Sequence, residues 1–453
     1  MRRLLSLIAL FSLSTLAAQD LAKVNHALPT SSRIFIYPTE DEAAKQDFRQ
    51  NNRYNTLLTD WSVDGHLFTT RFTMPFAWLN RQVVLRVGAT SGEYVVRVNG
   101  HMIRENSVGA LAGSFALTPY VKEGANLLEI ELNPHPTYAK LEDWTGKNEP
   151  FVRDVRLMSP PKMHIRDVVT STWRADKQKQ EATAQIGIIV KTETLNPRTS
   201  QFYYTLHSPL DERIKMGNQE LTLALKEEDT LRVVGQIPYP MMWSPANPKL
   251  YDLRIKTKHE GRFVEYVSLP VGFCLVERDG GRLMINGEPI ALRGAEVDPT
   301  ISNREIDDLK LAKCNLMVLR PGALRDDLLD YCDQVGMFVI VQAPIDTHTS
   351  GLSRRRGGNP SNDPAFRDEF LKRTEQLFHA TKRHPSILAF SLAHLSANGI
   401  NLYESYLNLK HFADPRPVIY PDAAGEWNND PLQYELVTLG GSASNGVQKP
   451  ISE

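Results

Sequence analysis

Hydrophobic and polar residues alternate with a period of two along the first part of the chain. Residues 68–74 and 93–98 show this alternation, and turn residues separate such segments. The alternation predicts half-buried β-strands, and Asn99-Gly100 is typical of a hairpin turn. Many short strands at near-regular spacing predict a β-sandwich over residues 19–160, with no helix in it.

A second run of strands covers residues 161–270 and predicts a second β-sandwich. Residues 185–190 form a continuous run rich in β-branched side chains. Near the end of this part, Trp243 precedes a proline-rich turn and Tyr251 follows it. We expect both aromatic side chains to have a structural role and to seal the end of the sandwich.

From residue 271 onwards, strand patterns alternate with helix patterns. Short apolar runs and amphipathic segments follow one another as strand 316–319, helix 324–335, strand 337–341, helix 369–381, strand 387–392 and helix 402–411. Such alternation is typical of parallel βαβ units. A complete (β/α) barrel needs about 250 residues, which is more than this part offers. The sequence therefore predicts an incomplete (β/α) TIM-type barrel over residues 271–453.

Composition and charge limit the classes of partner. The chain has 453 residues, 42% of them hydrophobic and 23% charged, with a formal net charge of -1. This balance gives no electrostatic reason to expect nucleic acid or an anionic membrane as a partner. The three cysteines, Cys274, Cys314 and Cys332, cannot all be paired, and burial as small apolar side chains is favoured over a disulfide.

The first 18 residues have the pattern of a secretory signal peptide. Basic residues Arg2 and Arg3 precede an apolar run at 4–16, and small residues follow at Ala17 and Ala18. A membrane span needs about 20 apolar residues, and neither this run nor any later stretch reaches that length. We expect an exported protein without a membrane span, located in the periplasm, on the cell surface or outside the cell.

Several short motifs along the chain form a consistent set. They are Val98-Asn99-Gly100 and Gly113-Ser114-Phe115 in the first sandwich, Trp243-Ser244-Pro245 in the second, and Ile285-Asn286-Gly287 and His384-Pro385-Ser386 in the last part. Together they resemble glycoside hydrolase family 2, which contains β-galactosidases, β-glucuronidases and β-mannosidases. The resemblance covers residues 33–420. It implies a jelly-roll β-sandwich, an immunoglobulin-like β-sandwich and a TIM-type barrel, in that order.

The same resemblance indicates that the catalytic groups of the family are missing. Retaining glycosidases need two carboxyl groups about 5 to 5.5 Å apart. The family's acid/base glutamate falls on Leu395, next to His394, and its nucleophile strand falls beyond the last residue of this sequence. We therefore predict no catalytic residue. Glu426, beside Trp427, is interpreted as an exposed residue rather than as a replacement nucleophile.

Polar residues remain at four positions where the resemblance implies contacts with a sugar or a metal. Asp346 and His348 match a carboxylate and an imidazole that bind magnesium together with the acid/base glutamate in the β-galactosidase branch. Because Leu395 replaces that third ligand, we predict no metal and no cofactor, and expect Asp346 and His348 to hydrogen-bond to each other or to a loop. The candidate substrate-binding residues are Arg320, Asp346, His348 and His394.

Two of these residues have alternative interpretations. Arg320 is either an ion-pair partner inside the barrel or a contact for a sugar or carboxylate. His394 is a polar loop residue, a ligand contact or a catalyst. A triad of Ser391, His394 and Asp346 has no support in the spacing, because the motif G-x-S-x-G is absent. The basic, glycine-rich loop at 353–364 is either a solvated loop or a contact for an acidic partner or an anionic glycan.

These observations lead to one main hypothesis, an exported pseudoenzyme with a carbohydrate-binding or protein-scaffolding role. An incomplete barrel leaves an unpaired edge and apolar inner residues. We expect the segment from Pro421 to fold across the gap, or another exported protein to dock there, with a glycan as the other possible partner. The alternatives are an active β-glycosidase that uses other or partner-supplied carboxylates, and the remnant of a frameshifted or truncated gene.

Overall fold

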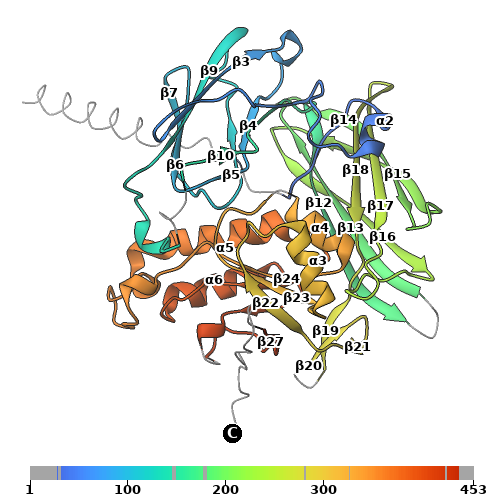
Figure 1. Cartoon of the computed structure of the whole chain (residues 1–453). Helices are drawn as coiled ribbons and strands as arrows, with labels where there is room; N and C mark the ends of the chain where they lie inside the picture. The colour runs from blue at the N-terminus through green and yellow to red at the C-terminus, as the bar shows by residue number, and fades with distance from the viewer. Residues whose placement is uncertain are drawn as a thin grey trace, which may run out of the picture.

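The structure is a computed structural model that describes residue 28 and residues 32–144, 149–176, 181–279, 282–325, 327–423 and 426–437. Two β-sandwiches lie against a third part made of a parallel sheet and helices (Figure 1). The signal peptide predicted at 1–18 lies outside the described residues. No described helix has the length and apolar character needed to cross a membrane.

The first sandwich packs a five-stranded sheet, in the order β2-β3-β9-β6-β7, against a four-stranded sheet, in the order β1-β11-β4-β8. Alternate residues of their strands, such as Val96, Phe115 and Ile130, meet in one apolar core. The strands are β1 (Asn55–Leu57), β2 (Ser62–Asp64), β3 (Leu67–Met74), β4 (Val84–Val87), β5 (Ala89–Thr90), β6 (Tyr94–Val98), β7 (His101–Ser107), β8 (Gly113–Ala116), β9 (Gly124–Leu132), β10 (Val152–Arg153) and β11 (Arg156–Met158). Two short 3-10 helices are η1 (Phe76–Trp78) and η2 (Ala139–Leu141).

The second sandwich packs sheet β12-β13-β16 against sheet β15-β14-β17-β18. Its core includes Ile188, Phe202 and Leu253. The strands are β12 (Met163–Asp176), β13 (Glu181–Thr192), β14 (Arg198–His207), β15 (Arg213–Leu223), β16 (Glu228–Pro238), β17 (Tyr251–His259) and β18 (Arg262–Val271).

The prediction that residues before 160 form no helix is wrong, because α2 (Glu40–Lys45) lies there. Thr39 caps its N-terminus by accepting a hydrogen bond from the backbone N–H of Glu42, and acidic residues fill the first turn. The helix packs on β18, and Tyr37 pairs with Tyr266 of that strand. This segment therefore lies on the second sandwich and not on the first.

Trp243 joins the second sandwich to the third part and does not seal the sandwich end. Its ring is fully buried, lies 5.2 Å from the ring of Phe338 and donates a hydrogen bond of 2.8 Å to the carbonyl of Asp333. Tyr251 lies in the sandwich core, 5.0 Å from the ring of Phe273. The structural role predicted for both residues is confirmed, and Trp243 fills an interface between domains.

The third part is built on a parallel sheet in the order β26-β25-β24-β23-β22-β27. Helices cover one face of it, since Met317 and Leu319 pack against them while Leu316 and Val318 point to the opposite, inner face. The strands are β22 (Arg293–Val297), β23 (Leu316–Leu319), β24 (Phe338–Gln342), β25 (Ile387–Ser391), β26 (Val418–Ile419) and β27 (Glu435–Leu436). The helices are α3 (Asn303–Leu311), α4 (Leu328–Val335), α5 (Arg367–Thr381) and α6 (Ile400–His411).

Shorter elements complete this part. A three-stranded antiparallel sheet of β19 (Val276–Asp279), β20 (Arg282–Ile285) and β21 (Glu288–Pro289) packs Val276 and Ile285 against the inner face. The 3-10 helices are η3 (His348–Ser350), η4 (Pro360–Asn362), η5 (Pro364–Phe366) and η6 (Pro421–Ala423). Cys274, Cys314 and Cys332 form no disulfide, and the last two are buried. Five parallel strands, β22 to β26, together with β27 make the predicted incomplete barrel. The first four are each followed by an α-helix.

Residues 426–437, called here the closing segment, cover the gap that the incomplete barrel leaves. Leu432 and Tyr434 pack on the inner face of the sheet. β27 pairs in parallel with β22 at one edge. At the other edge, the backbone N–H groups of Val418 and Tyr420 donate to the side chains of Asp430 and Asn429, each at 2.8 Å. The expectation that the chain itself folds across the gap is confirmed.

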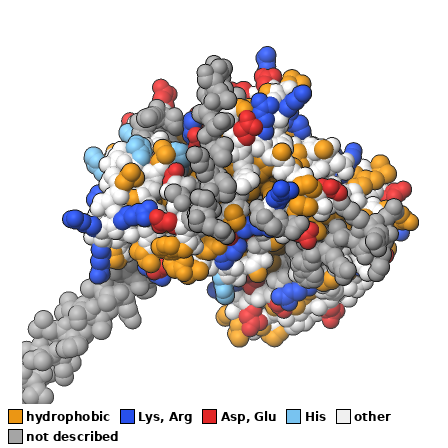
Figure 2. All heavy atoms as spheres, turned by 90° about the horizontal axis from the view of Figure 1, so that it is seen from below, with side chains coloured by type: hydrophobic (Ala, Val, Ile, Leu, Met, Phe, Trp, Pro, Cys, Tyr) orange, Lys and Arg blue, Asp and Glu red, His pale blue; other side chains and the backbone are white. Residues whose placement is uncertain are grey.

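Charged side chains of both signs are interspersed on the face of the molecule drawn in Figure 2. This agrees with the net charge of -1.

Asp430 is the residue on which the closing segment most depends. It is buried, accepts hydrogen bonds from Val418, Tyr406 and Lys410, and forms an ion pair with Arg278. Asp430→Ala leaves buried donors unsatisfied, which costs about 1–3 kcal/mol for each group. We expect the free energy of unfolding to fall by at least that amount in urea denaturation.

The control for this variant is Asp368→Ala on α5, where the carboxylate is exposed and pairs only with its neighbour Arg367 among the described contacts. Its effect is expected to stay within about 0.5 kcal/mol. Equal effects of the two variants would contradict the role given to Asp430.

The buried carboxyl group of Glu265 is expected to make the free energy of unfolding depend on pH. Burial raises the pKa of this carboxyl from 4.5 to about 7, against the hydrogen bonds that it accepts from Thr257 and the backbone of Ile165. The folded state therefore holds a proton that the unfolded state releases, and stability falls as pH rises from about 4.5 to about 7. Glu265→Gln is expected to remove this part of the pH dependence in thermal unfolding. An unchanged pH dependence would refute the assignment.

Candidate functional site

The carboxyl ends of five neighbouring strands meet at one edge of the parallel sheet, called here the carboxyl edge. Glu296 lies on β22, and Arg320, Asp346, His394 and Asp422 follow β23, β24, β25 and β26 in turn. Active sites of barrel enzymes form at this edge, because loops from different strands converge there. His394 follows β25, and each of the other four strands places a titratable side chain near it.

His394 lies between two carboxylates. Its Nδ1 is 2.8 Å from Asp346 Oδ2, and its Nε2 is 3.3 Å from Glu296 Oε1. Burial opposes a charge on the ring, but the hydrogen bonds to Asp346 and Glu296 outweigh it and raise the pKa to about 9. Both ring nitrogens therefore carry protons at neutral pH, and neither is free to act as a general base.

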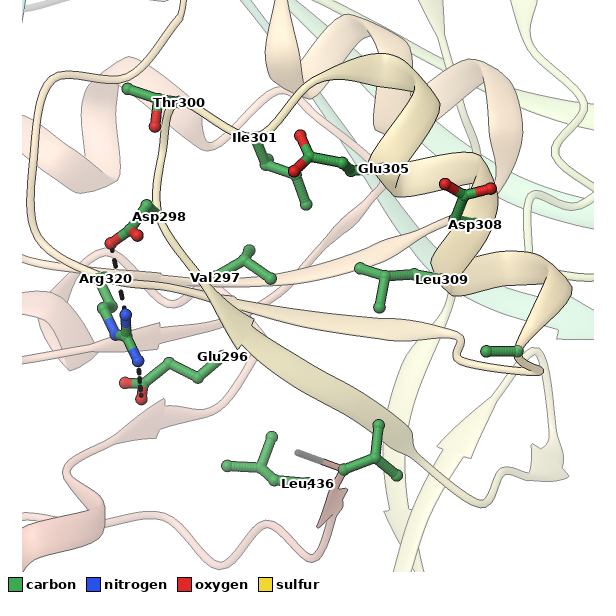
Figure 3. Close-up of a pocket in the computed structure, with 12 residues that line it drawn as sticks. Glu296, Val297, Asp298, Thr300, Ile301, Glu305, Asp308, Leu309, Arg320 and Leu436 are labelled. Carbon is green, nitrogen blue, oxygen red and sulfur yellow. Dashed lines mark hydrogen bonds and ion pairs between the residues drawn. The ribbon is translucent and has the colours of Figure 1, made fainter. Parts of the chain in front are cut away.

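Charged contacts extend from both carboxylates. Arg320 contacts Glu296 at 3.3 Å and Asp298 at 3.5 Å, as Figure 3 shows. On the other side, His348 Nδ1 is 2.8 Å from Asp346 Oδ1. The hydrogen bond expected between Asp346 and His348 is present, and Arg320 forms ion pairs at the barrel edge.

The first sandwich contributes to the same site. Asp143 accepts hydrogen bonds of 2.7 Å and 2.8 Å from the backbone and side chain of Thr349. Backbone hydrogen bonds also join Leu141 and Asp143 to Asp346. Between Leu141 and Asp143 in the chain, the carboxylate of Glu142 pairs with the fully buried guanidinium of Arg373 at 2.7 Å. These contacts hold the sandwich on the barrel at the site.

The residues present do not fit the magnesium site that the family implies. Asp143, Asp346 and His348 offer ligand atoms within 4.8 Å of one another. Both oxygens of Asp346, however, already accept hydrogen bonds from imidazole N–H groups. Magnesium prefers oxygen ligands in octahedral geometry, and only two carboxylates are at hand. No step of the chemistry is derived through a metal.

Leu395 is the residue at which the sequence resemblance predicts the family's acid/base glutamate. Its φ angle is 39°, in the left-handed region, and its side chain is 48% exposed. The loop around it is ordered by contacts of Ser396 with Tyr420 and of Asn398 with Glu426. The loop thus keeps a defined shape around a side chain that has no proton to donate.

The pKa values of Asp422 and Glu296 are shifted in opposite directions. Burial raises the pKa of Asp422, and the negative charges of Glu296 and Asp346 raise it further. The hydrogen bond from His394 holds the pKa of Glu296 below its usual value. The pKa values of the two carboxyl groups are therefore shifted in opposite directions, as those of an acid and a nucleophile are.

Two other sequence-based candidates do not join this site. Ser391 is buried and its hydroxyl donates to the carbonyl of Ala393 at 3.0 Å, so the triad with His394 does not form. Glu426 is bound by Arg354 at 2.6 Å and by Asn398 at 2.7 Å. Arg354 belongs to the basic loop at 353–364, so one basic side chain of this loop already forms an ion pair within the protein.

Sequence reasoning did not identify Glu296, Asp422 or Asp143 as site residues. Glu296 lies between the buried Ala295 and Val297 on β22, and this alternation could have placed it on the inner face. Asp143 comes from another domain, and no spacing in the sequence indicates that contact.

Comparisons with known proteins agree with this architecture. A family model described as "Glycosyl hydrolases family 2" matches residues 163–273, and one described as its TIM barrel domain matches residues 322–437. The β-galactosidase of Priestia megaterium is 26% identical over 373 residues, which are 78% of this chain and 36% of that protein. The β-galactosidase of Psychromonas ingrahamii is 26% identical over 378 residues, 78% of this chain and 35% of that protein.

Solved structures show the same fold. A β-glucuronidase of Bacteroides uniformis matches with a TM-score of 0.65 and 19% identity, over 78% of this chain and 46% of that one. The β-D-glucuronidase of Dictyoglomus thermophilum matches with a TM-score of 0.66 and 19% identity, over 84% of this chain and 75% of that one.

Two sandwiches followed by a barrel whose carboxyl edge carries the site define the architecture of a β-glycosidase. The chain belongs to glycoside hydrolase family 2. It spans about a third of the length of the curated β-galactosidases that it matches.

The charge on His394 is a testable property of the site. Asp346→Asn removes one of the two carboxylates, so the pKa of His394 is expected to fall from about 9 towards its ordinary value of 6.5. NMR titration of the His394 imidazole in the wild type and in the variant measures this pKa. Because the folded pKa is raised, His394 stabilises the fold below about pH 6.5, and this contribution is lost as pH rises through about 9.

Asp298→Asn is the matched control, since Asp298 contacts Arg320 and lies one residue beyond the strand residue Val297. It should leave the pKa of His394 nearly unchanged. A wild-type His394 that titrates near pH 6.5 would rule out the proposed imidazolium.

Proposed function

We propose that this protein is an exported pseudoenzyme that binds carbohydrate at the carboxyl edge without hydrolysing it. The observation that carries the proposal is that Leu395 is preceded in the chain by His394, whose two ring nitrogens each contact a carboxylate. Leu395 stands where the family's proton donor belongs, and His394 holds Glu296 and Asp346 in ion pairs. Carboxylates neutralised in this way are poor nucleophiles and cannot donate a proton.

Accessible polar and aromatic groups support carbohydrate binding. The side chains of His348 and Arg320 are 50% and 44% exposed, whereas that of Asp346 is 4% exposed. We infer that His348 and Arg320 contact the ligand, and that Asp346 positions His348 and His394. Trp427 is 54% exposed and its ring lies 4.1 Å from that of Tyr403, so it offers a rigid apolar platform. Its neighbour Glu426 accepts a hydrogen bond from Asn398, which places this platform beside the loop of Leu395 and outside the cluster around His394.

Export is inferred from the residue pattern at 1–18 alone. A β-galactoside or β-glucuronide is the first ligand class to test, because relatives and structural neighbours carry the names β-galactosidase and β-glucuronidase.

An active β-glycosidase is the second candidate, and one observation favours it. The raised pKa of Asp422 and the lowered pKa of Glu296 suit an acid and a nucleophile. Against it, Asp422 accepts a hydrogen bond from the backbone of Leu395, and His394 and Arg320 bind Glu296.

Assays with aryl β-galactoside, β-glucuronide and β-mannoside separate the two functions. We expect no turnover by the purified protein and saturable binding of the matching oligosaccharide in calorimetry. Turnover that disappears in Glu296→Gln, Asp422→Asn, Asp346→Asn or Glu426→Gln would overturn the pseudoenzyme proposal.

Trp427→Ala is expected to weaken oligosaccharide binding at least about tenfold, which corresponds to about 1.4 kcal/mol. Phe76→Ala is the control, because Phe76 is an exposed aromatic residue of the first sandwich, far along the chain from the site. Loss of binding in both variants, or in neither, would contradict the place assigned to the carbohydrate.

A further inference from the structure

A cavity of about 840 Å³ lies beside β22, between α3 and β27 (Figure 3). Its apolar lining includes Val297, Ile301 and Leu309, all buried in the core beneath the helices. Leu436 and Val437 of the closing segment line it on the side of β27. The volume lies within the range of about 300–1,000 Å³ that is usual for binding pockets.

The backbone ladder of β22 is incomplete at this cavity. On one side, β22 pairs with β23 as far as Val297 and Leu319. On the other side, β27 pairs only with Arg293 and Gly294. No strand of the described part of the chain pairs with 295–297 on that side. A stretch of parallel strand without a partner on one side is a template for another strand.

The charges around the cavity are mostly negative. Four carboxylates line it, from Glu296, Asp298, Glu305 and Asp308. Arg320 is the one basic residue among the lining residues, and it pairs with Glu296 and Asp298. Both acidic residues of α3 line the cavity and are exposed, and no basic residue of the lining pairs with them. Glu305 also accepts hydrogen bonds from Ser302 in the N-terminal cap of α3, so Asp308 is the more available of the two.

We propose that this edge binds an extended, basic segment of another protein. The segment pairs as a strand with residues 295–297 of β22, beyond the two residues that β27 pairs with. It places lysine or arginine side chains against Glu305 and Asp308. Backbone hydrogen bonds supply affinity in such an addition, and side-chain charge supplies selectivity. The proposal goes beyond carbohydrate binding and does not depend on it.

The chain's own C-terminal residues are a poorer match in charge. Residues 438–453 contain one lysine, Lys449, and one glutamate, Glu453, so they carry no net positive charge. Charge complementarity thus favours a partner with several basic residues over this segment.

The experiment is a fluorescence anisotropy titration of the full chain with a labelled ten-residue peptide that alternates valine and lysine. We expect saturable binding that weakens at least tenfold in Asp308→Lys. Asp307→Lys is the matched control, because Asp307 is exposed on the same helix, contacts Tyr331 and is not part of the lining. Trp427→Ala should leave peptide binding unchanged, which separates this result from the carbohydrate test.

Backbone recognition is tested with the same peptide N-methylated at alternate residues, made in both alternations. At least one of the two is expected not to bind, because methylation removes the N–H groups that face β22. Equal binding of all three peptides would show attraction by charge alone and would overturn the proposal. A helical basic peptide that binds more tightly would overturn it as well.

Three further outcomes would also overturn the proposal. The full chain does not bind the peptide at all. Binding appears only after residues 438–453 are deleted, which assigns the cavity to the chain's own end. The protein forms a concentration-dependent dimer that Asp308→Lys abolishes, which assigns the cavity to a second copy.

Discussion

A parallel sheet needs cover on both faces and at both edges, and this requirement governs the last part of the molecule. Helices α3 to α6 cover the outer face (Figure 1). On the inner face, Trp243, the β19–β21 sheet and the closing segment take the place of barrel strands that the described structure lacks. Asp430 and Asn429 satisfy the N–H groups of β26 with side-chain oxygens, so that edge is closed without a further strand. The short pairing of β27 leaves 295–297 without a strand partner on that side among the described residues.

The site depends on the same architecture. The carboxyl ends of neighbouring parallel strands bring Glu296, Asp346 and His394 together, although the chain separates them widely. The loop from the first sandwich then fixes Asp346 through backbone hydrogen bonds, and the buried pair of Arg373 and Glu142 anchors that loop. Burying this pair is costly unless both partners are present. The two domains are therefore held in one position at the site.

Ion pairs decide what the site is able to do. His394 donates a hydrogen bond to a carboxylate from each ring nitrogen, and Arg320 binds Glu296 as well. Such a network lowers the reactivity of each carboxylate, yet it leaves His348, Arg320 and Trp427 accessible to a ligand. The arrangement suits binding better than proton transfer. The pKa of the Asp422 carboxyl is raised, which is why turnover is tested through it.

The sequence by itself determined the order of the domains and the strands and helices of the incomplete barrel, and it predicted the loss of the acid/base glutamate at Leu395. These follow from local periodicity and from motifs that lie close together in the chain. It also led to Arg320, Asp346, His348 and His394, of which Asp346 does pair with His348 and His394. Only the tertiary structure decided that Glu296, Asp422 and Asp143 join them, and that Trp243 fills a domain interface. Those contacts link residues far apart in the chain, so their partners are set by packing and not by any local pattern.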